Sequence, residues 1–334
     1  MADLLKLVTG ADLVAYAEAF NYKTNFMGDS LFPSSKTDNF LVDIEKVIEG
    51  GDLPVMAQVH ALDTEARIGD RPNFKKLEAE KLLIKEKLNR TERISRLLKA
   101  SSRNLTDNDL VKAIYDDAGN LISRVLTRVE VMRMELLATG KLTVKENNVE
   151  TTIDYNMDAA NKVDFSSWSD ADHSILSDLE TIRTLAQSKG KVITRALTST
   201  KVIGYMKANK EIKAYFAGTG LVPSEKRILQ FIFDEYQIAF ATNDEVYKTS
   251  AQDSTTYRFY PENKITFFGG NGNIGKTLYA ETPEETEDVG YSATALVTLT
   301  QWKNQDPVAV WTKASAVSLP VVADIDNIFI ATLV

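Results

Sequence analysis

The sequence predicts an α+β protein built as two domains or as one elongated domain. Three observations lead to this expectation. The chain has 334 residues, one apolar stripe predicts a helix of about thirty-three residues, and the segments after Trp168 alternate between helical and strand periodicity. The composition, 44% apolar and 26% charged, is typical of a soluble globular protein.

An extended arm is expected near the N-terminus. Residues 11–20 have helical apolar spacing, and the stretch 21–40 is rich in Asn, Gly, Ser and Pro, which favours an irregular path. The arm has too many large apolar side chains for a free tail, so we expect them to dock on another surface, which can belong to a neighbouring molecule. They are Phe20, Phe26, Leu31, Phe32 and Phe40.

A basic two-stranded loop is expected next. From residue 53 to 87 a strand pattern breaks at 69–72 and then resumes, so we expect two strands joined by a polar tip. Such a ribbon is marginal by itself and needs a partner. Residues 65–103 include twelve basic and six acidic side chains, a charge of +6 in a chain of net charge −8. This asymmetry favours contact with another copy of the protein, although a solvated charged surface explains it as well.

A long helix is the strongest predicted element. Thr106, with Asp109 three residues later, has the spacing of a capping box, and Gly140 is placed to end the helix. At 1.5 Å per residue the helix measures about 50 Å, which is longer than a compact domain needs and indicates a spine. Apolar residues at intervals of three or four form one stripe along it: Leu110, Ile114, Ala118, Leu121, Val125, Val129, Met132 and Leu136.

A mixed body of helices and strands follows the long helix. Residues 141–155 predict a hairpin with a Glu-Asn-Asn turn. The acidic run 281–288 can hold a metal ion, but an exposed loop explains it better. The strand-rich segment 308–334 is expected to close a sheet. Between hairpin and acidic run, helical periodicity occurs at 171–187, 200–216 and 224–236, and strand patterns at 191–199, 237–243 and 264–270.

The residue inventory excludes several functions. The chain has no cysteine, which excludes disulfides and thiolate chemistry, and its two histidines, His60 and His173, are interpreted as structural. Neither a G-x-S-x-G elbow nor an H-E-x-x-H helix supports hydrolysis. No apolar run reaches the ~20 residues needed to cross a bilayer, and no secretory signal pattern is present, so we expect synthesis in a cytosol. The net negative charge argues against sequence-independent binding of nucleic acid.

The run GNGNIGKT at residues 270–277 fits the phosphate-binding pattern G-x-x-x-x-G-K-[ST]. A working phosphate loop needs a strand before it and a helix after it, because phosphate binds at the helix N-terminus. Residues 265–268 supply the strand, but Pro283 interrupts any helix within two turns. Asp324 is the one candidate for a magnesium-binding Asp at a strand end. We therefore interpret the run as a glycine-rich hairpin turn.

The order of arm, basic loop, spine helix, hairpin, mixed body and returning strands resembles the major capsid proteins of tailed bacteriophages, specifically the lambda-type major capsid protein E family. The likeness is carried by LFP at 31–33, PVMAQVHALDTEARIGDRPNF at 54–74, ITFFGGNGNIGKTLYA at 265–280 and, most strongly, DPVAVWTKASAVSLPVVADIDNIFIATLV at 306–334. It spans nearly the whole chain, and its specificity lies in the order and spacing of these stretches.

The resemblance implies the Hong Kong phage type of capsid fold. Its parts would be an N-terminal arm (1–45), an extended two-stranded loop region (46–103), a peripheral domain with the spine helix (104–165), an axial domain (166–305) and C-terminal strands (306–334) that return to the peripheral domain. Proteins of this kind catalyse nothing and need neither cofactor nor metal. They assemble in the host bacterial cytoplasm into hexamers and pentamers of an icosahedral shell. The shell encloses double-stranded DNA without sequence-specific binding or a membrane, and scaffold, portal and decoration proteins are further partners.

Two other classes of function stay open, a nucleotide-binding enzyme that uses residues 270–277 and an interaction module of another multiprotein machine. For a shell subunit, we expect deletion of about residues 65–90 to leave a soluble, folded body that cannot form closed particles. The candidate contacts between subunits are Phe26, Leu31, Phe32, Arg67, Arg71, Phe74, Lys75 and Lys76.

Overall fold

The computed structural model describes residues 12, 15, 16, 19, 26–47, 74–91, 107–147, 149–165, 167–220, 222–270, 272–287, 296–306, 308–322 and 324–333. The chain forms two compact units. Unit 1 combines Met1–Val42, Glu80–Arg133 and Lys276–Val321, and unit 2 combines Asp43–Ala79, Met134–Gly275 and Val322–Val334. Each unit is therefore assembled from three separate stretches of sequence. The five domain boundaries expected from the resemblance stay a prediction.

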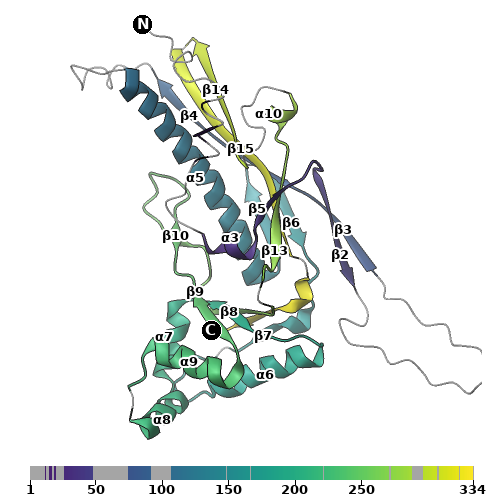
Figure 1. Cartoon of the computed structure of the whole chain (residues 1–334), viewed down its shortest axis with the longest axis vertical. Helices are drawn as coiled ribbons and strands as arrows, with labels where there is room; N and C mark the ends of the chain where they lie inside the picture. The colour runs from purple at the N-terminus through teal and green to yellow at the C-terminus, as the bar shows by residue number, and fades with distance from the viewer. Residues whose placement is uncertain are drawn as a thin grey trace, which may run out of the picture. The chain divides into compact units, whose positions relative to one another are not determined.

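Unit 1 contains a five-stranded sheet centred on the long strand β15 Val308–Val322 (Figure 1). The strand β14 pairs antiparallel with it on one side, from Thr298↔Ser315 to Gln305↔Val308, and β4 pairs antiparallel on the other. The order β1-β13-β15-β14 completes the sheet. The segment expected to close a sheet thus lies at its centre. The remaining strands are β1 Ser34–Lys36, β4 Leu82–Thr91, β13 Gly275–Ala280 and β14 Thr298–Gln305.

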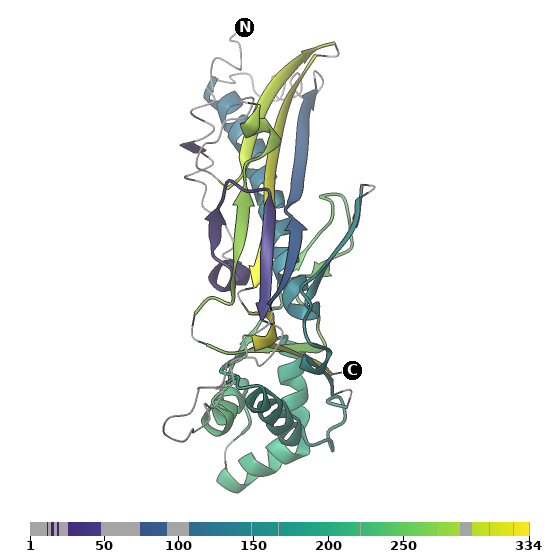
Figure 2. The same cartoon turned by 90° about the vertical axis from the view of Figure 1, so that its right-hand side faces the viewer.

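The predicted spine helix is confirmed as α5 Asp107–Thr139, a helix of 33 residues. Every member of the apolar stripe whose side chain is described is buried, from Ala118 to Leu136. In unit 1 this stripe packs on the sheet, where Leu299, Ala314 and Ala316 complete the core. In Figure 2 the strands of the sheet lie in front of α5. Gly140 follows the helix at φ 71°, and its N–H donates to the carbonyl of Leu136, so the predicted glycine does end it.

The two-stranded loop differs from the expectation in its pairing. The strand β3 Phe74–Glu80 pairs with β2 Leu41–Val47, which precedes the predicted first strand. The continuation after residue 80 is not part of this ribbon, because β4 pairs with β15 in the sheet of unit 1. Residues 48–73, which include the predicted polar tip, lie outside the described residues. The prediction of one ribbon that extends to residue 87 was therefore wrong.

Unit 2 contains the predicted hairpin, β5 Lys141–Glu146 and β6 Val149–Asp154, and a second five-stranded sheet in the order β7-β16-β12-β8-β9. The strand β16 is interior, antiparallel to β12 and parallel to β7. The sheet consists of β7 Lys162–Asp164, β8 Arg195–Thr198, β9 Ala239–Thr242, β12 Lys264–Phe268 and β16 Ile328–Thr332.

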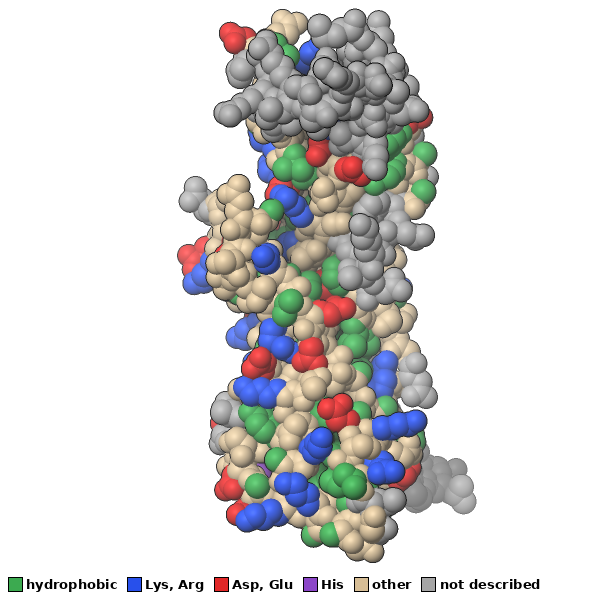
Figure 3. Space-filling model, turned by 90° about the vertical axis from the view of Figure 1, so that its left-hand side faces the viewer, with side chains coloured by type: hydrophobic (Ala, Val, Ile, Leu, Met, Phe, Trp, Pro, Cys, Tyr) green, Lys and Arg blue, Asp and Glu red, His purple; other side chains and the backbone are tan. Residues whose placement is uncertain are grey.

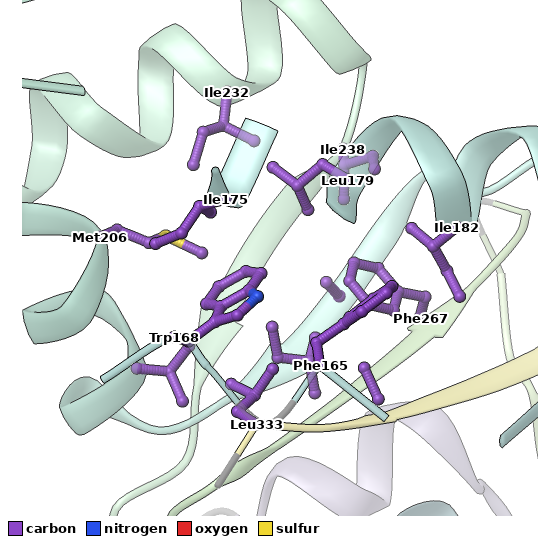
Figure 4. Close-up of a cluster of buried hydrophobic side chains, with 14 of the residues drawn as sticks. Phe165, Trp168, Ile175, Leu179, Ile182, Met206, Ile232, Ile238, Phe267 and Leu333 are labelled. Carbon is purple, nitrogen blue, oxygen red and sulfur yellow. The ribbon is translucent and has the colours of Figure 1, made fainter. Parts of the chain in front are cut away.

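Four helices pack with this sheet into one apolar core, to which Trp168 contributes the largest side chain (Figure 4). Three helical segments were predicted, and the second is divided by Asn209 into two helices. The side chain of Asn209 accepts a hydrogen bond from the N–H of Ile212, so it caps the second of them. The helices are α6 Ile175–Ser188, α7 Thr200–Ala208, α8 Lys210–Thr219 and α9 Glu225–Tyr236.

Six short elements complete the described structure. The helix α3 Met27–Leu31 lies in the N-terminal arm, and α10 Pro283–Thr286 lies in the acidic run. No helix in the described part of the chain is long and apolar enough to span a bilayer. The others are the ribbon β10 Val246–Tyr247 and β11 Tyr257–Arg258 and the 3₁₀ turns η1 Ala159–Asn161 and η2 Ile325–Asn327.

Candidate assembly surface

A buried polar network fixes the N-terminal arm to unit 1. Glu130 of α5 accepts a hydrogen bond from the backbone N–H of Gly28 in α3 at 2.9 Å and one from Arg133 Nη1 at 3.2 Å. Arg133 also donates from Nη1 to Asp29 at 2.6 Å and from Nε to the hydroxyl of Thr277 at 2.8 Å. One arginine therefore joins the arm, the long helix and strand β13.

The electrostatics of this network depend on its burial. Glu130 is fully buried, and burial raises the pKa of its carboxyl, although the Gly28 N–H and Arg133 oppose the shift. A buried ion pair is costly unless each member keeps its partners. Undocking α3 would take both the Gly28 N–H and the Asp29 carboxylate away from the pair. The network therefore favours one position of the arm.

Strand β1 continues the arm along the sheet. It pairs in parallel with β13, with Ser34 opposite Thr277, and the N–H of Thr277 donates to the carbonyl of Pro33 at 3.1 Å. The hydroxyl of Thr277 donates to the carbonyl of Phe32 at 3.2 Å. These bonds hold the described arm against its own unit.

The candidate contact residues fall into three groups. Phe26, Leu31 and Phe32 are only 8%, 7% and 0% exposed, so their burial needs no neighbouring molecule. Arg67 and Arg71 lie outside the described residues. Phe74, Lys75 and Lys76 belong to β3, of which the backbone is described. The role of all eight residues between subunits stays a prediction.

Lys81 ties the junction of β3 and β4 to the arm. Its ammonium group donates to the hydroxyl of Thr37 and to the carbonyl of Asn39, and its N–H donates to the carbonyl of Phe40 at 3.2 Å. Burial lowers the pKa of this lysine, while the nearby Asp38 opposes the shift. The base of the loop is therefore held by a buried cation, which the charge pattern alone did not distinguish from its exposed neighbours.

The glycine-rich run is not a phosphate site. The residues that would begin the required helix form strand β13, and Thr277 is already bonded to the arm. The turn presents carbonyls to the start of strand β8, since Arg195 donates to Gly272 O and Thr194, which precedes the strand, donates to Gly270 O. Gly270 has the expected positive φ of 76°. The hairpin interpretation was wrong, however, because β12 and β13 belong to different sheets.

The acidic run contains a capped helical turn, and only part of it is exposed. Thr282 and Glu285 make a capping box at the start of α10. Glu284 is buried and accepts hydrogen bonds from Lys313 and, at 2.8 Å, from Ser315. Burial alone would raise the pKa of Glu284, but these two donors outweigh it and lower the pKa. No group of three or more potential metal ligands occurs within the described ranges.

The histidines and Asp324, which the sequence offered as candidates for chemistry, have structural roles where they are described. His173 Nε2 lies 2.7 Å from Asp178 Oδ2, which also accepts from Trp168 Nε1 at 2.7 Å. Asp324 caps η2 and accepts from Lys191, so it is not at a magnesium site. His60 lies outside the described residues. On the face shown in Figure 3, basic and acidic side chains are interspersed, and the coloured residues there form no continuous basic stripe.

A pair of tryptophans on the unit 1 sheet escaped the sequence interpretation. Trp302 of β14 lies directly opposite Trp311 of β15, and the rings stack at 6.0 Å with an interplanar angle of 8°. The signal was present in the sequence, because the two tryptophans are equally far from the dipeptide Asp306-Pro307 and face each other if the flanking segments form a hairpin.

Comparisons with known proteins agree over nearly the full length. The family described as phage major capsid protein E matches residues 9–333. A presumed capsid protein of a prophage of E. coli CFT073 has a TM-score of 0.65 at 15% identity, with 98% of this chain and 99% of that chain covered. A phage-related protein of Bordetella bronchiseptica RB50 has a TM-score of 0.57 at 12% identity, with 96% and 95% covered. The capsid protein of Myoviridae phage XM1 has a TM-score of 0.54 at 12% identity, with 95% of each chain covered. No curated protein matches the sequence.

Proposed function

The chain belongs to the phage major capsid protein E family, and on that premise we propose that its copies form the hexamers and pentamers of an icosahedral shell around double-stranded DNA. Members of this family are structural proteins of the virion, so the chain is a capsid shell subunit and not an enzyme. Its mixed fold is that of Hong Kong phage-type capsid proteins.

The observation that carries the proposal is the family match over residues 9–333. A shell subunit must bind several neighbours at once, and each specific interface buries on the order of 1,000 Å² or more. The basic loop and the anchored arm are segments that can supply such area. Contacts that repeat around rotation axes close into rings and shells. Residues Arg67, Arg71, Phe74, Lys75 and Lys76 are proposed to belong to these contacts.

The interior of the shell is proposed to hold DNA without binding its sequence. Sequence-independent affinity for DNA comes from neutralising phosphates with lysine and arginine. A chain of net charge −8 is poorly suited to that role, and a wall with weak affinity for phosphate lets the packaged polymer slide. Assembly in the host bacterial cytoplasm, together with scaffold, portal and decoration proteins, completes the proposal.

The direct test is size-exclusion chromatography with negative-stain electron microscopy of the purified full chain. We expect closed particles or capsomers. A chain that remains monomeric at every concentration and salt condition would contradict the proposal. An ATP-binding assay with the Lys276→Ala variant is a second test. ATP binding by the unchanged chain that is lost in this variant would support the nucleotide-binding alternative.

A deletion in the loop tests the assembly mechanism. Removing residues 65–90, as the sequence suggested, would destroy β4, which pairs with β15 and contributes Ile84 and Leu88 to the core. That expectation of a folded body was therefore wrong. Replacing residues 48–73 with a short Gly-Ser linker spares β2, β3 and β4. We expect this variant to remain folded and to lose closed particles, whereas normal particles would show that the loop is dispensable.

A further inference from the structure

Trp302 and Trp311 lie on the face of the unit 1 sheet that α5 does not cover. Along β15, alternate residues face opposite sides, and Ala314 and Ala316 belong to the core with α5. Trp311, Lys313 and Ser315 consequently face the other way. On β4, Glu86 and Arg90 form ion pairs with Arg124 and Asp117 of α5, so Lys85 and Lys87 share the tryptophan face.

The exposed end of this face contains two lysines beside the stacked tryptophans. Lys87 places its ammonium group 4.5 Å from the centroid of the Trp311 ring, and Lys85 and Lys87 are both exposed. Leu83, further along the same face of β4, is 40% exposed. We call Trp302, Trp311, Thr300, Lys85 and Lys87 the tryptophan patch. It combines two cations with stacked indoles, and tryptophan is enriched at the energetic centres of protein interfaces.

Two polar atoms of the tryptophan patch have no hydrogen-bond partner. Trp311 Nε1 and Thr300 Oγ1 are both buried, and neither is bonded to any described residue. A buried indole N–H usually finds an acceptor, so an unpaired one is unusual.

The neighbouring part of the same face shows what kind of acceptor fits. There, α10 places the carboxylate of Glu284 against Lys313 and the hydroxyl of Ser315. One carboxylate thus satisfies a lysine and a hydroxyl on this face. Lys85 and Lys87 on the same face are exposed donors, and no described residue supplies a carboxylate to either of them.

We propose that the tryptophan patch is a docking site for an acidic segment of a second copy of this chain. The partner's carboxylate oxygens pair with Lys85 and Lys87, and its apolar groups cover the stacked rings. Charge complementarity selects this partner, because the stretch 65–103, which contains both lysines, carries +6 in a chain of net charge −8. The inference rests on the proposed shell, which brings copies into contact.

Tryptophan fluorescence tests the docking directly. The chain has three tryptophans, and the third, Trp168, is buried in unit 2. In the full chain with Trp168→Phe, emission therefore reports the tryptophan patch alone. We expect the acrylamide quenching constant to fall several-fold when free subunits assemble into particles. Particles whose tryptophans remain as accessible as in the free subunit would overturn the docking site and leave the shell proposal standing, whereas a chain that never associates would overturn both.

A charge-reversed pair of variants separates docking from a general charge effect. Lys87→Glu changes an exposed cation of the tryptophan patch, and Lys303→Glu makes the same change on an exposed residue of the opposite face of β14. We expect Lys87→Glu to raise the concentration needed for assembly about tenfold or more, and Lys303→Glu to change it less than twofold. Equal effects of the two variants would overturn the proposal.

Discussion

The backbone N–H of Gly28 donates to Glu130 Oε1 across 2.9 Å, and a Cβ at residue 28 would lie 2.2 Å from Glu130 Oε2. The helix α3 therefore approaches α5 so closely that the contact leaves no room for a side chain. The arm is positioned by the absence of a methyl group as much as by the hydrogen bonds of Arg133.

Gly28→Ala is expected to destabilise unit 1 by about 1–3 kcal/mol, the usual cost of an added methyl group in a filled site. Urea unfolding followed by Trp302 and Trp311 emission in the Trp168→Phe chain measures this loss in unit 1. Gly204→Ala is the control, because a Cβ there meets nothing within 4 Å and lies on helix α7. The stability of this control variant is measured from Trp168 emission in a chain that lacks Trp302 and Trp311. Its free energy of unfolding should be unchanged or higher by up to ~1 kcal/mol. A neutral Gly28→Ala would contradict the tight contact.

Glu130→Gln is expected to change how the stability of unit 1 depends on pH. Folding raises the pKa of Glu130 above its ordinary 4.5, chiefly through burial. The unfolded chain therefore releases this proton first, and the charged carboxyl costs folding free energy as the pH rises through the window above 4.5. Relative to the glutamine variant, the free energy of unfolding of the wild-type chain should decrease as the pH increases from 4 to 8. Emission of Trp302 and Trp311 in the Trp168→Phe background measures it. A constant difference across that range would show that ionisation of Glu130 is not coupled to folding.

Glu284→Gln is expected to have the opposite pH dependence. The pKa of Glu284 is lowered because the hydrogen bonds from Lys313 and Ser315 outweigh burial, so its ionised form stabilises the fold above pH 4.5 and the benefit is lost as the pH falls through the lowered pKa. At pH 7 the variant should be less stable by about 1–3 kcal/mol, and the difference should shrink in acid. Glu281→Gln, an exposed residue beside the same helix, is the control and should stay within ~0.5 kcal/mol. The prediction fails if both variants behave alike.

Thr266→Val is expected to destabilise unit 2 by about 1–3 kcal/mol, because two buried polar groups lose their partner. The hydroxyl of Thr266 donates to Leu137 O at 2.7 Å and lies 2.8 Å from the hydroxyl of Tyr260. Tyr260→Phe removes one of the orphaned groups, so the double variant should lose less than the sum of the two single changes. Unfolding followed by Trp168 emission measures the cycle. Strict additivity would indicate that the two hydroxyls are energetically independent.

The sequence predicted the features that depend only on residues close together along the chain. The stripe from Leu110 to Leu136 was sufficient to identify α5, because a helical period is a local property of the chain. Strand pairing is not local, and this is why β3 was assigned the wrong partner and why the glycine run was taken for a hairpin turn. Nothing in residues 264–280 indicates that their two strands belong to different sheets.

Burial of single side chains was equally hard to predict. Glu284 lies in a run of acids that indicates solvent exposure, yet Lys313 and Ser315, about thirty positions away, bring it into the interior. Phe32 was expected to dock on some surface, and its own unit supplies that surface. The partner groups in each case come from distant segments, which composition does not identify. The pairing of Trp302 and Trp311 could have been predicted, because a hairpin about residues 306 and 307 places the two rings together.

Both sheets have an interior strand that is made late in translation. Strand β15 is central in unit 1 and β16 is interior in unit 2, and both follow residue 307. A nascent chain that stalls before this point leaves the apolar stripe of α5 without its main cover and divides the second sheet. Such a fragment exposes core residues to proteases. We therefore expect a chain interrupted before residue 308 to be degraded before it can take a place in a shell.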